Sequence, residues 1–140
     1  MRSRASTHFL NAVVATGTFL ITLVGMSQDA PLPDPPLGIS AQEHGALRLS
    51  ELQTRSMKVI SAAPLPQFYP VQARLARRPG MARLDVLVDA EGGVVEVRIL
   101  DESPLDHGFG EAAAAVAKTF KYYNPFNRLV VHVGTIKFSP

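Results

Sequence analysis

Hydrophobic and polar residues alternate along two neighbouring segments in the second half of the chain. In Met81 to Asp89, one face carries apolar side chains and the other polar ones, with Leu87 as the exception; the apolar set is Ala82, Leu84, Val86 and Val88. This alternation is typical of a half-buried strand. After Gly92-Gly93 it resumes, and the side chains expected inside are Val95, Val97 and Ile99. Two such strands around a glycine turn predict a β-hairpin.

The apolar period then lengthens to that of a helix. The residues that share one helical face are Phe109, Ala113, Val116, Ala117 and Phe120, and they are expected to cover the sheet. A shorter helical stretch over Val71 to Arg78 precedes the hairpin and stops at Pro79-Gly80. Leu129 to Phe138 alternates again and is the third strand. The order predicts an α+β fold, with a three-stranded antiparallel sheet covered by two helices on one face, over residues 66–140.

An uncharged stretch from Phe9 to Met26 follows Arg2 and Arg4 near the N-terminus. Its length and charge pattern indicate a membrane-engaging segment, either a retained anchor or a cleaved signal peptide, within residues 1–27. The apolar residues expected to meet the membrane are Phe9, Leu10, Val13, Val14, Phe19, Leu20, Ile21, Leu23 and Val24. Arginines before the stretch predict that everything after it lies outside the cytoplasm.

Residues 28–65 have the composition of a linker. Four prolines between Pro31 and Pro36 favour an extended, solvated path. His44 to Ala62 carries a loose amphipathic pattern that suggests a helix. Fully extended at about 3.1 Å per residue, the segment would reach roughly 120 Å, and a helix within it would shorten that reach.

Composition narrows the range of chemistry. The chain has no cysteine, which excludes disulfide scaffolds, thiolate metal sites and cysteine nucleophiles. Its net charge of +2 comes from the N-terminal arginines, since the remainder from Ser27 onward is neutral, and a nucleic-acid partner is therefore not expected. The four histidines lack metal-ligand spacing, and Asp106-His107 has the position of a helix cap. The sequence thus predicts a protein that is not an enzyme and that needs no metal or cofactor.

The last strand is a candidate for binding another chain. A three-stranded sheet has two edges, and an uncovered edge offers unpaired N–H and C=O groups to an added strand. Leu129 to Phe138 contains no proline and a single charge, Lys137. The residues expected to contact a partner are Leu129, Val130, Val131, His132, Val133, Gly134, Thr135 and Ile136, with Tyr123 or Phe126 lining a groove beside them. The alternatives are that the linker or a second copy of the domain covers this edge.

Residues 66 to 138 resemble the C-terminal domain of the TonB energy-transducer family. The resemblance rests on the order and spacing of Tyr69-Pro70, Ala73, Gly80, the hairpin around Gly92-Gly93, Ser103, Phe109, Ala113, Ala117, Phe120-x-Tyr122, Pro125 and a final strand. It departs from the family pattern at Phe120, where a Trp is usual, in the extra residue Asn124, and in its short spacer. Ser6 and His8 lack the spacing of the residues that engage the motor in the family.

The resemblance implies a role in coupling. Members of the family link inner-membrane ExbB and ExbD motor proteins to outer-membrane transporters, whose TonB-box segment pairs with an edge strand of this domain. The expected location is the envelope of a Gram-negative bacterium, either anchored in the inner membrane with a periplasmic domain or free in the periplasm. The alternative is a structural or assembly protein of the envelope that uses the same domain to form a homodimer or to bind a partner without transmitting force.

Overall fold

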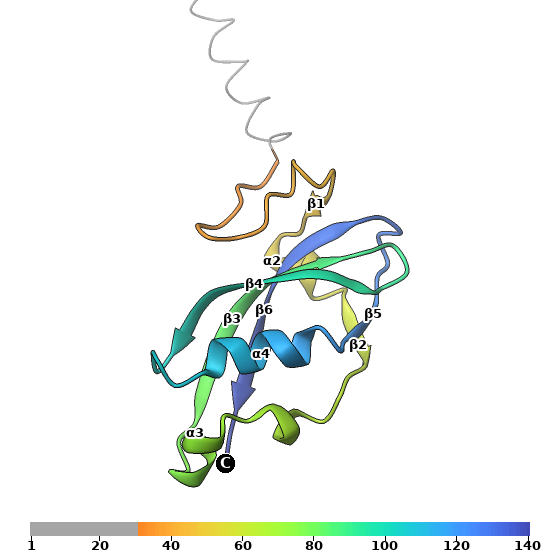
Figure 1. Cartoon of the computed structure of the whole chain (residues 1–140). Coiled ribbons are helices and arrows are strands. Elements are labelled where there is room, and N and C mark those ends of the chain that lie inside the picture. Colours follow the sequence, from red (N-terminus) through yellow and green to blue (C-terminus); the bar gives the residue numbers. More distant parts are fainter. Residues whose placement is uncertain (1–30) are drawn as a thin grey trace, which may run out of the picture. The chain divides into compact units, whose positions relative to one another are not determined.

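A computed structural model describes residues 31–140, of which Leu32–Pro140 form one compact unit (Figure 1). The membrane segment predicted within residues 1–27 lies outside the described residues. Among the described residues, no helix combines the length and the apolarity needed to cross a membrane.

The main sheet has four strands in the order β1-β6-β3-β4. Their bounds are β1 Leu47–Arg48, β3 Gly80–Val88, β4 Val94–Ser103 and β6 Val130–Phe138. Strand β3 runs antiparallel to both β4 and β6, as expected, whereas β1 runs parallel to β6. The expectation of a three-stranded sheet was wrong because the fourth strand comes from the segment read as a linker.

The hairpin of β3 and β4 is confirmed, but its inner face differs from the prediction at one position. The register shifts between Leu87 and Val88, so that Val94 rather than Val95 pairs with Val88. This is a β-bulge: the extra residue in one strand has no partner in the other, and the side chains beyond it point to the opposite faces from those that strict alternation predicts. Val95 is therefore 57% exposed, whereas Val94 packs against the core.

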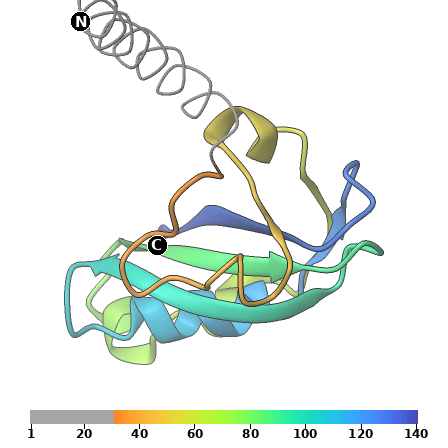
Figure 2. The same cartoon turned by 90° about the horizontal axis from the view of Figure 1, so that it is seen from above.

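Helix α4 covers one face of the sheet (Figure 2). It runs over Phe109–Ala117 and contacts β3 and β4. Helix α3 (Val71–Leu75) and the short 3-10 helix η1 (Leu65–Phe68) contribute Ala73 and Leu65 to the same core. The core residues on this face include Ala82, Leu84, Val86, Phe109, Ala113, Ala117 and Phe138. The stripe of α4 from Phe109 to Ala117 is buried as predicted, whereas Phe120 lies beyond the end of the helix and Ile99 of β4 is 37% exposed.

The segment read as an amphipathic helix over residues 44–62 is instead three short elements. Strand β1 is followed by α2 (Glu51–Thr54) and by β2 (Lys58–Ser61). Helix α2 starts at a capping box, since the Gln53 N–H donates to Ser50 Oγ and the Ser50 N–H donates to Gln53 Oε1. Strand β2 pairs with β5 (Lys121–Tyr123) in a second, two-stranded sheet. The apolar residues at helical spacing in this segment belong to different elements, and the helix predicted from that spacing is therefore wrong.

Residues 32–49, which we call the strap, cover the sheet face opposite α4. Ile39 and Ala41 of the strap pack on Leu87 and Val131. This explains why Leu87 breaks the alternation of β3: both faces of that strand are buried. The expected solvated spacer is therefore folded from Leu32 onward.

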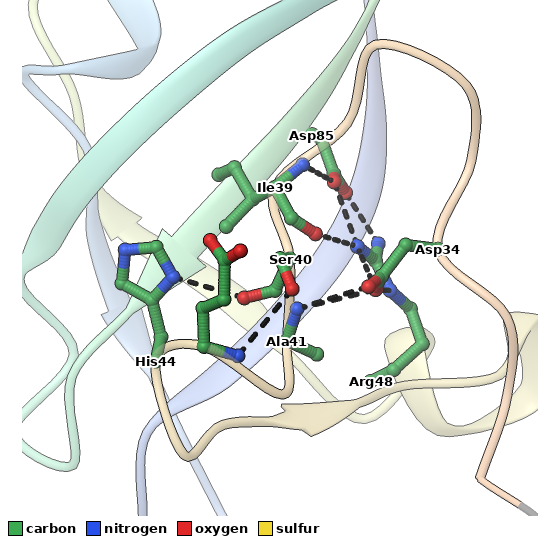
Figure 3. Close-up of polar contacts among 8 residues, drawn as sticks. Asp34, Ile39, Ser40, Ala41, His44, Arg48 and Asp85 are labelled. Atoms are coloured by element: carbon green, nitrogen blue, oxygen red, sulfur yellow. Dashed lines mark hydrogen bonds and ion pairs between the residues drawn. The ribbon is translucent and has the colours of Figure 1, made fainter.

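A buried ion pair holds the strap to the sheet (Figure 3). Asp85 of β3 is fully buried and Arg48 is 7% exposed. Arg48 donates from Nη2 to Asp85 Oδ2 at 2.8 Å and to Asp34 Oδ1 at 2.9 Å, and the Ile39 N–H donates to Asp85 Oδ2 at 2.7 Å. Burial opposes the charge of Arg48, but its hydrogen bonds with the two carboxylates outweigh burial and raise its pKa.

Candidate functional site

Within residues 31–140, strand β6 pairs with another strand on its outer edge only at its start, and helix α2 lies close to β6 beyond that point. The N–H groups of Leu47 and Leu49 donate to the carbonyl oxygens of Leu129 and Val131, at 3.0 and 2.9 Å. Because backbone groups alternate between the two sides of a strand, the N–H and C=O groups of Val133, Thr135 and Lys137 point to the same outer edge. Within residues 31–140, no strand pairs with β6 there. We call Val133 to Lys137 the open stretch.

A hollow of about 290 Å³ lies beside the open stretch on the α4 side of the sheet. Its floor is formed by Leu84, Val86, His132 and Gly134, and its far wall by Met57 and Val59. The remaining lining residues are Thr54, Ala117, Phe120, Tyr122, Val133, Thr135 and Ile136. We call it the helix-side hollow. No residue that lines it bears a formal charge while His132 is neutral.

A second hollow, of about 380 Å³, lies beside the same stretch and is lined by Leu49, Glu51, Thr54, Arg83, Val133 and Thr135. Arg83 pairs with Thr135 across β3 and β6, on the face opposite α4. Thr54 lines both hollows, so they meet at the edge of β6. An added strand would therefore find an uncharged hollow on one face and a charged one on the other.

His132, in the floor of the helix-side hollow, is a buried polar residue without hydrogen bonds from its side chain to residues 31–140. It is 3% exposed, and neither ring nitrogen has a hydrogen-bond partner among residues 31–140. Its ring meets Tyr122 edge-on, with ring centroids 5.1 Å apart. Burial lowers the pKa of His132 and raises the pKa of Tyr122 to about 12, so both are neutral near pH 7.

The lowered pKa of His132 makes stability depend on pH. Below about pH 6.5 the unfolded chain takes up a proton at His132, whereas the folded chain resists it until its lowered pKa is reached. The unfolded state then binds more protons, so the free energy of unfolding should fall with falling pH by at most about 1.4 kcal/mol per pH unit. The backbone of Val133 and then the carboxylate of Asp85 favour the protonated ring, whereas the charge of Arg48 opposes it.

Urea unfolding of the full chain at about pH 7.5 and about pH 5.5 measures this dependence. His132→Leu removes the titrating group and should lose less stability over that interval than the natural chain does. Equal pH dependence in the two proteins would contradict the assignment.

The predicted contact residues are placed unequally by the structure. Val130 and Val131 are fully buried, and β1 covers that part of the strand. Leu129 is half-buried against the cluster under the strap. The residues at the open stretch or in the hollows are His132, Val133, Gly134, Thr135 and Ile136. The available edge is therefore the second half of the strand.

The aromatic residues expected to line the groove are not the ones that do so. Strand β5 turns Tyr122 inward and leaves Tyr123 56% exposed, while Phe126 packs against the core. Phe120 and Tyr122 line the helix-side hollow instead. Thr54, Met57 and Val59 were missed altogether because their segment was read as linker.

The predicted helix cap at Asp106-His107 is wrong. The N-cap of α4 is Gly108, which makes no side-chain hydrogen bond, and the Gly110 N–H in the first turn donates to Glu102 Oε2 instead. Asp106 and His107 lie in the loop before α4, where His107 Nδ1 is 2.6 Å from the Leu105 carbonyl oxygen. No cluster of three or more His, Asp or Glu side chains with metal-binding geometry occurs within residues 31–140.

Comparison with known proteins agrees with this geometry. A family model described as Gram-negative bacterial TonB protein C-terminal matches residues 66–139, which span the chain from η1 through β6. No curated protein matches the chain significantly. The match covers more than half of the 140 residues. The chain belongs to the TonB C-terminal family, a family of non-enzymatic domains of the Gram-negative envelope.

Proposed function

We propose that this protein binds an extended segment of an outer-membrane transporter by strand addition along the open stretch of β6, and so couples the inner membrane to transport. The observation that carries the proposal is the row of outward N–H and C=O groups from Val133 to Lys137, which no strand within residues 31–140 pairs. Membership of the TonB C-terminal family supports the choice of partner.

The chemistry of the edge also supports strand addition. Val133 and Thr135 are β-branched, and neither proline nor a bulge interrupts the register of β6 against β3. Main-chain hydrogen bonds would supply affinity, and the two flanking hollows would receive alternate side chains. Coupling further requires an inner-membrane anchor within residues 1–27 and a motor of the ExbB/ExbD kind, and both remain part of the proposal.

Replacing Thr135 by proline tests the edge directly. Thr135→Pro removes an outward N–H group and breaks no hydrogen bond to β3, so the fold should survive while pairing with an added strand is lost. The measurement is calorimetric binding of a synthetic TonB-box peptide from a transporter of the same bacterium. We expect affinity to fall by roughly tenfold or more.

Thr135→Val is the matched control, because it keeps both the outward N–H group and the branched side chain. It should bind the peptide as the natural chain does. Equal binding by Thr135→Pro, with an unchanged circular dichroism spectrum, would rule out strand addition at this edge. A position in the covered part, such as Val131, is unsuitable because its carbonyl already accepts from Leu49.

The alternative function uses the same edge for a second copy of the chain. An open edge can pair with an identical one, which would give a homodimer in the envelope that transmits no force. Sedimentation that depends on concentration, together with no affinity for any TonB-box peptide, would favour this alternative.

A further inference from the structure

We propose that the helix-side hollow is a specificity pocket for one uncharged, hydrogen-bonding side chain, such as a carboxamide on an apolar stem, presented by the strand added to β6. This inference rests on the proposed function and specifies the chemistry of the bound segment. It follows from three features of the hollow. Gly134 has no side chain to fill it, no residue that lines it is charged while His132 is neutral, and the imidazole of His132 has no hydrogen-bond partner within residues 31–140.

The first feature is the open space over Gly134, which has no side chain. This residue lies on the α4-facing side of β6, between His132 and Ile136. A Cβ atom built on it would meet a single neighbour within 4 Å, the Cε1 atom of His132 at 3.7 Å. The space over Gly134 is therefore open, and it lies beside the edge where an added residue would place its side chain.

The size of the hollow fits a side chain rather than a single solvent molecule. Water occupies roughly 30 Å³ per molecule in the liquid, and the hollow measures about 290 Å³. Met57, Val59 and Phe120 form apolar walls suited to a methylene stem.

The missing charge excludes acidic and basic side chains. None of the lining residues bears a charge that could pair with a buried carboxylate or ammonium group, and burying a charge without a partner is costly. The charged residues near the edge, Glu51 and Arg83, line the other hollow. Charged residues of a bound strand would therefore be accepted on that opposite face.

The imidazole of His132 supplies the polar requirement. Its Cε1 edge faces the space over Gly134, and the two ring nitrogens flank that carbon. Neither nitrogen has a hydrogen-bond partner within residues 31–140, and both are covered by neighbouring atoms, so a turn of the ring is needed to bring its donor or its acceptor to a side chain in the hollow. A carboxamide also carries both a donor and an acceptor, so it can satisfy this ring, whereas an alkyl group would leave it unsatisfied.

The test uses small molecules, so that the pocket is examined apart from strand addition. Butyramide, butyrate and butylammonium share a short alkyl stem and differ in charge. Each is titrated into the full chain carrying 15N-labelled histidine, and the imidazole signals, assigned with a His132→Gln variant, are followed by NMR. We expect butyramide to shift the His132 signals saturably and to bind roughly tenfold or more tightly than either ion.

Three variants test whether butyramide binds in the helix-side hollow. Gly134→Val fills the hollow and should abolish butyramide binding, whereas Lys137→Val, on the same strand but not among the residues that line the hollow, should leave it unchanged. Lys137→Pro should also leave it unchanged, because the small molecule does not use the outward N–H group. Loss of peptide binding in Lys137→Pro with retained butyramide binding would support both proposals.

Other outcomes separate the two ideas. Equal binding of butyramide and butyrate, or butyramide binding that survives Gly134→Val, would overturn the pocket and leave strand addition standing. Butyramide binding at His132 together with peptide affinity untouched by Thr135→Pro would overturn strand addition and leave the pocket as a site for a free carboxamide.

Discussion

Replacing Arg48 by methionine should cost about 3–5 kcal/mol of unfolding free energy, since it leaves the carboxylate of Asp85 buried without a charged partner. Asp85 is fully buried, and both of its oxygens accept hydrogen bonds from the Arg48 guanidinium. Methionine retains much of the length of the side chain, so packing changes less than charge. Chemical denaturation of the full chain, with the midpoint and slope compared with the natural chain, measures the loss.

A second substitution distinguishes lost charge from lost shape. In the double variant Arg48→Met with Asp85→Asn, the asparagine oxygen can still accept from the Ile39 N–H, and no buried charge remains. We expect it to recover much of the stability lost in Arg48→Met alone. If the single and double variants were equally unstable, the loss would come from packing and the ion-pair argument would fail.

The same chain offers an exposed pair as the control. Arg83 and Asp101 join β3 and β4, with side chains 50% and 51% exposed and Nη2 2.6 Å from Oδ2. Solvent screens such pairs, so Arg83→Met should leave the unfolding midpoint almost unchanged. Hydrogen exchange in Arg48→Met should show the loss of protection first in the strap, since its anchor to the sheet is removed.

Replacing Gly92 by alanine is expected to be the most damaging single-methyl change, at about 3 kcal/mol or more. Gly92 has φ +91°, which favours glycine, and an added Cβ would lie 1.8 Å from the carbonyl oxygen of Tyr122. The carbonyl of Gly92 accepts from the Tyr122 N–H at 2.8 Å. The hairpin turn would therefore have to move away from β5 and break that hydrogen bond.

Gly45→Ala separates strain from collision. Gly45 also has a positive φ, +62°, but a Cβ there would meet nothing within 4 Å. Its cost should be limited to the backbone preference, roughly 1–2 kcal/mol. Thermal unfolding of both variants checks the difference, and similar midpoints would mean that the contact between turn and β5 yields easily.

The hairpin, α4 and β6 could be predicted from the sequence because each carries a long, regular pattern. Alternation from Ala82 to Val88 of β3, broken only at Leu87, and a helical stripe from Phe109 to Ala117 leave little ambiguity. Strand β1 could not be predicted in this way, since two residues have no period. It exists because Leu47 and Leu49 find carbonyl groups of β6 that are distant in sequence.

One sequence signal did point to the strap. Asp85 and Leu87 share a face of β3, and an apolar residue beside an acid on a face assigned to solvent is a local inconsistency. The structure resolves it by covering that face and pairing Asp85 with Arg48, 37 residues away in the chain. The prediction that the last strand is a binding edge rested on a three-stranded sheet with two edges and on the absence of proline. The observed pairing with β1 shows that the first part of this edge is occupied.

The docked strap also sets how far the domain can work from its point of attachment. A free spacer over residues 28–65 would reach roughly 120 Å. Leu32 onward lies inside the compact unit. If the segment predicted within residues 1–27 is retained as an anchor, only residues 28–31 lie between the two, and at about 3.5 Å per residue they could extend no more than roughly 14 Å.

An anchored protein would therefore hold its binding edge next to the inner membrane while the strap is in place. The Arg48 to Asp85 ion pair thereby keeps residues 32–49 from adding to the reach of an anchored protein, and these residues would lengthen the connection only if the strap left the sheet.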